Sequence, residues 1–373
     1  MIQILIMFIL IISSIFYVGY RLWMLIPSKK TSKILLAIFF VFEIGSLILI
    51  KVSGNKLLFP YPVISFIYNA MTAWFYISIY LTIIFIVLDL ARLLGVSKIN
   101  KYMFGSWRGM IYLSIITAFI MIFGYVNYLY KKRVELTINI SKQISSTKPP
   151  VKIVVIGDLN IGYGVGYKEL QRWIRLINKE TPDIVLITGD LLDYSLQQIY
   201  IKNIARELSQ INSQYGTFAI MGNQEYLIDK FDYKLEFRQF LNESRITLLR
   251  DSVALIDNSF YVIGRNDYLC RDRKPLSELT HTLDKSKPRI LLDHQPISFD
   301  EAVENNTNIQ FSGSISIGQI WPLSLFINSL FENPHGYMVK GNTHIYVTSG
   351  IGINGGKFRI GSQSEYVVVH LLP

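Results

Sequence analysis

The sequence has a single cysteine, Cys270, among 373 residues, which excludes a disulfide within the chain. Acidic residues are nearly missing from the first 130 positions, where only Glu43 and Asp89 stand against ten lysines and arginines. The remaining 243 residues carry 27 basic and 25 acidic side chains. The net charge of +10 therefore arises mainly in the first third of the chain, and nucleic acid is not expected as a partner.

Long apolar runs fill the part of the chain that lacks acidic residues. They cover about residues 2 to 27, 33 to 51, 62 to 91 and 108 to 130. Each run is about as long as the ~20 residues that a spanning helix needs, and tyrosine and tryptophan near the ends are typical of membrane interfaces. Four such runs exceed any signal peptide. We therefore predict a four-helix transmembrane region over residues 1–130.

The positive charges between these runs predict an orientation. The first and third loops hold more lysine and arginine than the second, which places them in the cytoplasm and both chain termini outside it. Lys131, Lys132 and Arg133 argue for the opposite orientation. Inside the runs, Glu43 is expected to make a packing contact rather than to transport an ion, and Asp89 is expected at the interface.

After Arg133 the pattern changes to short strands, amphipathic helices and glycine-rich turns, which predicts an α/β domain over residues 151–373 after a linker at 131–150. Polar residues follow several apolar strands, and ligands of α/β folds bind at such strand ends. Two alternate serines in FSGSISIGQ point to the same side of an extended loop. The strand-end residues are Asp158, Asn160, Asp190, Asn223, Gln224, His294, Ser314 and Ser316.

The strand-end motifs occur in the order GDLN, GDLLD, GNQE, LLDHQP and SGSISIGQ. This order resembles the calcineurin-like metallophosphoesterases, in particular their bacterial membrane-anchored branch, over roughly residues 150 to 370. The resemblance implies a four-layer αββα sandwich behind the transmembrane helices. It also implies a multi-pass protein of the bacterial inner membrane with an extracytoplasmic C-terminal domain. In that family two divalent ions share a carboxylate and activate the attacking oxygen.

Four positions agree with the family's metal site. The resemblance makes Asp158 the first carboxylate, Asp190 the bridging carboxylate, Asn223 the amide ligand and His294 the isolated imidazole ligand. The second acidic residues of their motifs, Asp193 and Glu225, are expected to stabilise loops through hydrogen bonds.

Four other positions depart from the family pattern, since Asn160, Gln224, Ser314 and Ser316 all stand where the family has histidines. Gln224 occupies the place of the catalytic histidine and cannot release a proton near neutral pH, so general acid help of roughly 10² to 10⁴-fold is lost. Neutral oxygens in place of imidazoles lower metal affinity and favour Mg²⁺, Mn²⁺ or Ca²⁺ over Zn²⁺. We therefore expect either no cofactor or one weakly bound divalent metal.

These departures predict a membrane-anchored pseudoenzyme with a binding or scaffolding role. One alternative is a weakly active or altered phosphoesterase acting on a phosphodiester or pyrophosphate at the membrane surface, and another is an accessory subunit whose helices do the work. The expected partners are the lipid bilayer and a phosphorylated lipid or membrane protein. His335 and His344 could replace a lost ligand, although surface or packing positions are favoured for both. Arg359 could contact an anion, although a charge at a strand edge is favoured.

Overall fold

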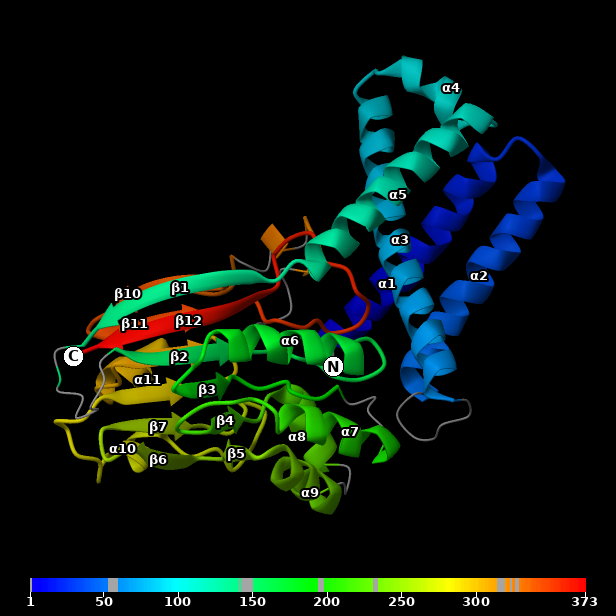
Figure 1. Cartoon of the computed structure of the whole chain (residues 1–373). Helices are drawn as coiled ribbons and strands as arrows, with labels where there is room; N and C mark the ends of the chain where they lie inside the picture. The colour runs from blue at the N-terminus through cyan, green and yellow to red at the C-terminus, as the bar shows by residue number, and fades with distance from the viewer. Residues whose placement is uncertain are drawn as a thin grey trace. The chain divides into compact units, whose positions relative to one another are not determined.

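The computed structural model describes residues 2–52, 60–140, 142, 150–193, 198–230, 234–313, 319–322, 324–325 and 329–373. The chain divides into two compact units. Unit 1 comprises Met1–Val126 and Gly355–Phe358, and unit 2 comprises Asn127–Asn354 and Arg359–Pro373. Figure 1 shows that unit 1 is helical and that unit 2 contains the sheets.

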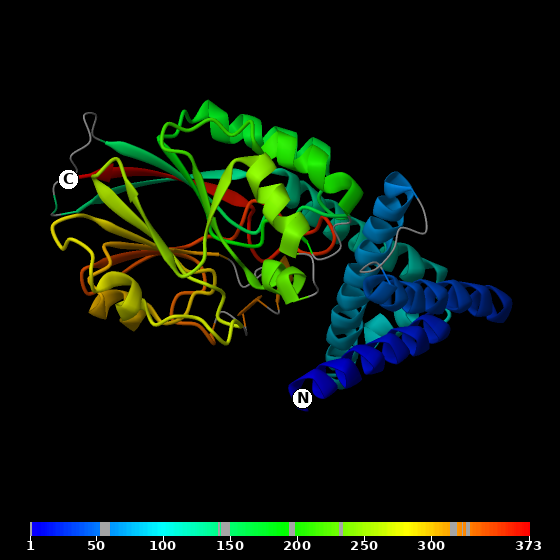
Figure 2. The same cartoon turned by 90° about the horizontal axis from the view of Figure 1, so that it is seen from below.

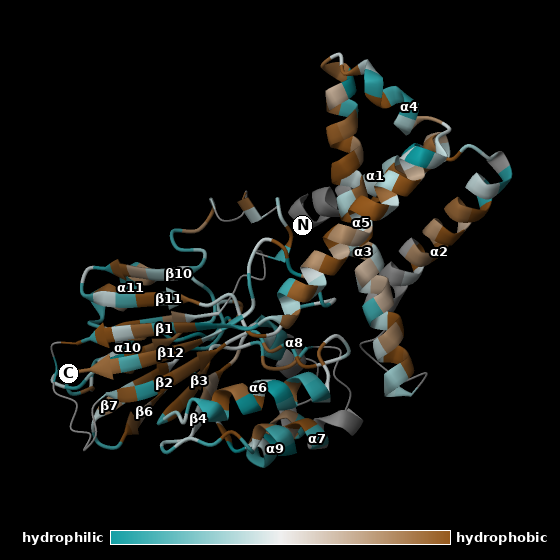
Figure 3. Ribbon diagram, turned by 45° about the horizontal axis from the view of Figure 1, so that its top comes forward, coloured by the Kyte–Doolittle hydropathy of each residue, from teal (hydrophilic) through white to brown (hydrophobic). Residues whose placement is uncertain are grey.

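Unit 1 is built from helices that follow the apolar runs of the sequence. They are α1 (Ile2–Leu25), α2 (Lys29–Val52), α3 (Tyr61–Leu93), the 3-10 helix η1 (Ser97–Ile99), α4 (Asn100–Met103) and α5 (Trp107–Leu129), whose last residues belong to unit 2. Phe39, Leu81 and Phe85 lie in the buried centre of the unit. Figure 3 shows mostly hydrophobic residues along these helices.

An ion pair joins two of these helices. Arg21 of α1 is buried, and its guanidinium lies 3.2 Å from a carboxylate oxygen of Asp89 in α3. The hydroxyl of Tyr17 donates a hydrogen bond of 2.6 Å to the other oxygen. Asp89 is therefore a packing partner within the helices. The side chain of Glu43 lies outside the described residues.

Two helices in the described part of the chain, α3 and α5, are long and apolar enough to cross a membrane. The structure therefore supports two of the four predicted spans. The four-helix transmembrane region as a whole stays a prediction.

Unit 2 contains two six-stranded sheets, seen edge-on in Figure 2. The first has the order β1 (Lys132–Asn139), β12 (Glu365–Leu372), β2 (Val151–Ile156), β3 (Ile184–Ile187), β4 (Thr217–Ile220) and β5 (Ile246–Leu249). The second has the order β10 (Gly336–Lys340), β11 (Thr343–Val347), β9 (Ile309–Ser312), β8 (Arg289–Leu292), β7 (Phe260–Gly264) and β6 (Ser252–Ile256).

The strands that lead to the site are parallel within each sheet. In the first sheet β2, β3, β4 and β5 run parallel, with Ile156 beside Ile187. In the second sheet β7, β8, β9 and β11 run parallel. Continuous apolar sequences such as VKIVVI and RILL suit strands that are covered on both faces.

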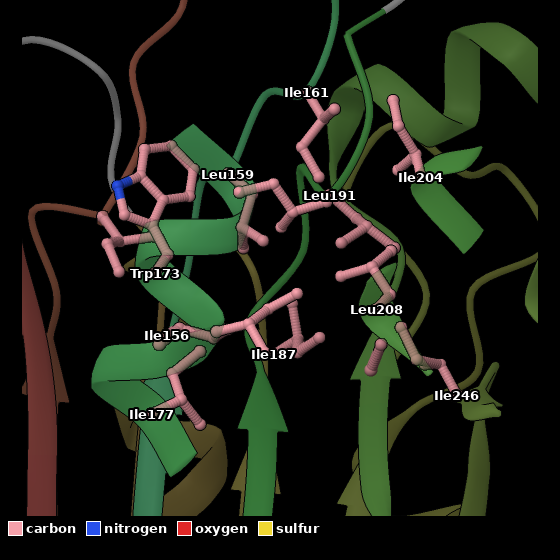
Figure 4. Packing of buried hydrophobic residues seen from close by; sticks show 14 of the residues in the cluster. Ile156, Leu159, Ile161, Trp173, Ile177, Ile187, Leu191, Ile204, Leu208 and Ile246 are labelled. Carbon is pink, nitrogen blue, oxygen red and sulfur yellow. The ribbon is translucent and has the colours of Figure 1, made fainter. Parts of the chain in front are cut away.

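Four buried clusters of the described residues define the layers. Side chains of both sheets, among them Ile153 and Val262, form one core between the sheets. The outer face of the first sheet packs against α6 (Tyr167–Lys179), α7 (Gln198–Leu208) and α9 (Lys234–Ser244), and Figure 4 shows Trp173 and Ile177 of α6 meeting Ile156 and Ile187. The second sheet is covered by α10 (Leu276–Thr280) and α11 (Phe299–Glu304). The mixed α/β sheets and their covering helices agree with the predicted sandwich.

The segment at residues 131–150, which the sequence analysis assigns to a linker, begins with β1. This strand pairs in parallel with β12, with Lys132 beside Glu365 and Asn139 beside Leu372. The sheet therefore recruits a strand that immediately follows α5. The sequence could not reveal this, because β12 lies more than 200 residues away along the chain.

Candidate metal centre

The carboxyl ends of three strands bring three predicted ligands together. Asp158 follows β2, Asp190 follows β3 and His294 follows β8 of the opposite sheet. One ligand atom from each lies within 4.8 Å of the other two, and all three side chains are buried. This arrangement arises because both sheets direct strand ends to the same side of the sandwich.

His294 is oriented by contacts on both ring nitrogens. Nδ1 lies 2.7 Å from the carbonyl oxygen of Thr188, and since a carbonyl only accepts, Nδ1 carries a proton and donates it. Nε2 then faces the site, 3.2 Å from Oδ1 of Asn223 and 3.5 Å from Oδ1 of Asp190. A hydrogen bond that fixes the distant nitrogen is the usual way in which proteins present an imidazole to a metal.

Glu225 holds the loops around Asp190. Its two carboxylate oxygens accept hydrogen bonds from the backbone N–H groups of Asp190 at 3.0 Å, Leu192 at 2.8 Å and Gly222 at 2.8 Å. The backbone N–H of Gln224 donates a further bond of 3.0 Å to Oδ1 of Asp190. The predicted loop-stabilising role of Glu225 is confirmed, and Glu225 holds the backbone of Asp190 in place.

The backbone around the ligands is strained and close-packed. Asp158, Asn160 and Asp190 adopt positive φ angles of 50°, 47° and 52°, which residues other than glycine rarely adopt. A Cβ on Gly189, whose φ is 97°, would lie 2.7 Å from Nδ1 of His294. Such conformations persist only where surrounding contacts enforce them, and they gather at functional sites.

The electrostatics of the cluster favour a bound proton in the metal-free protein. Burial raises the pKa of Asp190, which His294 only partly opposes. Burial alone would lower the pKa of His294, but Asp190 and Asp158 outweigh it and raise this pKa to about 9. Burial and the Asp190 carboxylate raise the pKa of Glu225 to about 7. At neutral pH His294 is therefore protonated beside Asp190 and Asp158.

Two of the positions that depart from the family pattern lie beside Asp190 and have side-chain atoms without a hydrogen-bond partner among the described residues. Asn160 is 2% exposed, and neither its amide nitrogen nor its oxygen has a hydrogen-bond partner among the described residues. The side-chain oxygen of Gln224 is likewise buried without such a partner. Buried amides of this kind are costly, so they indicate room for water, an ion or a ligand. Ser314 and Ser316 lie outside the described residues.

The remaining histidines contact groups elsewhere. His335 lies 3.2 Å from a carboxylate oxygen of Glu365, and Nδ1 of His344 lies 2.6 Å from the hydroxyl of Tyr337. Arg359 is buried and donates to the carbonyl oxygens of Ser349 at 2.7 Å and Gly352 at 2.8 Å. Arg359 is therefore part of the loop packing, and the expected surface or strand-edge position is wrong.

Sequence reasoning missed a buried ion cluster beside His294. Asp293 is 1% exposed, and Arg273 donates to both of its oxygens, at 3.0 and 2.5 Å. Arg265 lies 3.5 Å from Asp293 and 2.6 Å from Glu301. The sequence carries little sign of this cluster, because the arginines come from a loop that is distant along the chain from α11. The cluster anchors the segment that carries His294.

The donor set suits one divalent ion better than two. Two carboxylates, one imidazole and the amide oxygen of Asn223 converge, and such mixed oxygen and nitrogen ligands bind ions such as Mn²⁺ or Mg²⁺. On the side of Asp158 and Asn160 no second imidazole is found among the described residues. Whether each predicted residue binds a metal stays a prediction.

The α/β sandwich therefore brings two carboxylates and an imidazole at facing strand ends into an arrangement that could hold a metal ion. Residues 151–317 match the family model of the calcineurin-like phosphoesterases. The chain therefore carries a domain of this family, and the resemblance read from the motifs is confirmed. Members of this family normally bind divalent metals.

Three curated relatives are similar to this chain in sequence. A "transmembrane protein with metallophosphoesterase domain" of Danio rerio is 29% identical over 70% of this chain and 62% of its own length. An uncharacterized metallophosphoesterase of Helicobacter pylori is 31% identical over 60% of each chain. One of Campylobacter jejuni is 28% identical over 69% of this chain and 68% of its own. The match thus spans less than two thirds of the first two relatives, and the bacterial relatives agree with the expected bacterial branch.

Proposed function

We propose that this protein is a membrane-anchored, metallophosphoesterase-like binding protein that holds at most one divalent ion and has lost two-metal hydrolysis. The observation that carries the proposal is the set of side chains at the candidate metal centre, where His294 lies beside Asp158 and Asp190. Gln224 and Asn160 fill positions where the family has histidines. A retained fold with an altered site favours binding of a phosphorylated ligand over its cleavage.

The chemistry of the altered residues supports this proposal. A bound divalent ion would neutralise a phosphate and lower the pKa of a water molecule. Asp158, Asp190 and His294 would hold that ion. Gln224 can donate a hydrogen bond to a phosphate oxygen but cannot protonate a leaving group. This chain would therefore orient a phosphate without helping the leaving group to depart.

Membrane anchoring is supported by the surface of α5. Four of its large side chains, at spacings of three or four residues, are between 55% and 69% exposed: Ile111, Ile115, Phe119 and Ile122. An exposed apolar stripe of this kind is costly in water and suits contact with lipid. The printed name of the Danio rerio relative also contains the word transmembrane. We extend the proposal to a multi-pass bacterial inner-membrane protein with an extracytoplasmic domain.

One observation favours a second function. The Asp158, Asp190 and His294 cluster is oriented by Thr188 and Glu225 as a working ligand set would be. A single ion held there would support slow cleavage of a phosphodiester or pyrophosphate. This alternative and the binding role differ in one measurable property, which is metal-dependent turnover.

The test uses the full chain purified in detergent and stripped of metal. We would add Mn²⁺, Mg²⁺, Ca²⁺ or Zn²⁺, remove unbound ions, measure the bound metal by elemental analysis and assay cleavage of bis(4-nitrophenyl) phosphate. Asp190→Asn keeps the size of the side chain and is the matched control. We expect no more than one bound ion per chain and no turnover above that of Asp190→Asn.

Two results would overturn the proposal in different ways. Two bound ions per chain would show that neutral oxygens replace the missing imidazoles. Turnover with one ion that disappears in Asp190→Asn would establish the phosphoesterase alternative.

A further inference from the structure

A cavity in unit 2 is lined by none of the predicted metal-site residues. It has a volume of about 470 Å³, within the range of small-molecule pockets, and is formed by the end of α5, the residues that follow it and one face of α6. Its charged side chains are Lys131, Arg172, Arg175, Lys179 and the single acid Glu169. We call this cavity the α6 pocket.

The basic residues of the α6 pocket form one surface. Arg172, Arg175 and Lys179 are exposed and stand at helical spacing on α6, so they share a face of that helix. The acid among them is partly engaged, because one oxygen of Glu169 accepts a hydrogen bond of 3.0 Å from the backbone N–H of Gly166 at the start of α6. The pocket is therefore strongly cationic.

Aromatic side chains complete the pocket. The ammonium of Lys131 lies 3.7 Å from the ring centre of Tyr128 and 5.2 Å from that of Trp173, and it donates a hydrogen bond of 2.6 Å to the Tyr128 carbonyl. These contacts hold the charge of Lys131 at a fixed place. Leu129 and Leu176 add apolar lining. The pocket thus combines cations with an apolar wall, which matches a molecule that has both an anionic and an apolar part.

Chain connectivity places the pocket at a membrane surface. The candidate span α5 ends at Leu129, and Lys131 follows two residues later, so the chain allows a separation of at most about 7 Å. Tyr130 at this end is exposed, and tyrosine favours the headgroup level of a bilayer. This argument depends on the membrane anchoring proposed above.

We propose that the α6 pocket binds the phosphate of an anionic phospholipid headgroup, with the glycerol and upper acyl chain against Leu129 and Leu176. The shared chemistry is a phosphate, which a soluble phosphate compound could also supply. The apolar wall and the position beside α5 favour the lipid. Such a site would fix the domain at the membrane surface independently of the metal centre.

The test uses the full chain in detergent with phosphatidylglycerol or phosphatidylcholine added, and native mass spectrometry to measure bound lipid. The pocket variant is Arg172→Gln, Arg175→Gln and Lys179→Gln. Each basic residue near an anionic surface strengthens binding roughly fivefold, so this variant should bind phosphatidylglycerol roughly 100-fold more weakly. Phosphatidylcholine should bind weakly to wild type.

Three controls make the result specific. Lys168→Gln, Arg206→Gln and Arg238→Gln together remove three exposed helical cations that do not line the pocket, and this variant should bind phosphatidylglycerol as wild type does. Arg172→Lys with Arg175→Lys keeps the charge and should retain binding. Asp190→Asn alters only the metal centre and should also retain it.

Equal binding of phosphatidylglycerol to wild type and the pocket variant would overturn the proposal. Full displacement of the lipid by millimolar inorganic phosphate would overturn it in favour of a soluble ligand. Failure of the chain to remain in washed membranes would instead refute the anchoring on which the proposal rests.

Discussion

The two halves of the candidate metal centre differ in how firmly their side chains are held. On one half, His294 is fixed by the Thr188 carbonyl and faces Asn223, while Glu225 holds Asp190 through the backbone. On the other half, Asn160 has a buried amide with no partner among the described residues. Preorganised donors bind ions, whereas unsatisfied neutral amides contribute little. The comparison teaches that neighbouring contacts hold His294 and Asp190 in place, whereas no contact among the described residues holds the side chain of Asn160.

The largest expected effect comes from restoring the histidines of the family pattern. Asn160→His, Gln224→His, Ser314→His and Ser316→His together would restore the imidazoles that the family pattern contains. We expect hydrolysis of bis(4-nitrophenyl) phosphate with Mn²⁺ to rise at least about 100-fold over wild type, since a general acid alone contributes roughly 10² or more. The rates are compared with those of the same variant carrying His294→Ala, which should return to the wild-type level. A wild type as fast as the rebuilt protein would contradict the comparison.

The second-largest effect is expected when the imidazole of His294 is removed from the firmer half. His294→Ala should weaken Mn²⁺ binding at least about 100-fold, because even residues that only support ligands are worth 10 to 100-fold. Binding would be measured by titration calorimetry of the metal-free full chain. His281→Ala is the matched control, since His281 is exposed and its ring contacts only the carbonyl of Glu278 among the described contacts. Unchanged affinity in His294→Ala would place the ion elsewhere.

A pH series tests the same half without a mutation. The pKa of His294 is raised to about 9 in the metal-free protein, so below this pH an ion must displace a proton from Nε2. Mn²⁺ affinity should therefore rise about tenfold per pH unit from pH 7 and level off above pH 9. The stability of the metal-free fold changes with pH in the opposite direction. The stabilisation contributed by protonated His294 is fully present below about pH 6.5 and is lost as the pH rises through about 9. Calorimetry in buffers of different ionisation enthalpy would count the released proton, and a flat affinity would contradict the assignment.

The smallest effect is expected at Asn160. Because its amide has no partner among the described residues, Asn160→Ala should change Mn²⁺ affinity by less than about twofold. It should also leave thermal stability unchanged or slightly higher. A tenfold loss of affinity would show that Asn160 helps to hold the metal and would contradict the proposed difference between the two halves.

The motifs predicted much of the site because each stands directly after an apolar strand. Asp158, Asp190 and His294 were identified in this way, and the structure brings them together. The sequence could not predict the buried pairing of Asp293 with Arg273, the inward position of Arg359 or the pairing of β1 with β12. Each of these depends on contacts between segments far apart along the chain, for which no local pattern exists.

By itself the sequence determined the α/β domain and the polar residues at its strand ends, because hydrophobic periodicity and residue type are local properties. Only the tertiary structure decided which nitrogen of His294 faces the cleft and how Glu225 holds Asp190. It also decided that α6 and the end of α5 enclose a cationic pocket. The orientation of the His294 ring and the enclosure of the α6 pocket arise from packing between segments that are far apart along the chain. Local sequence patterns do not reveal such packing.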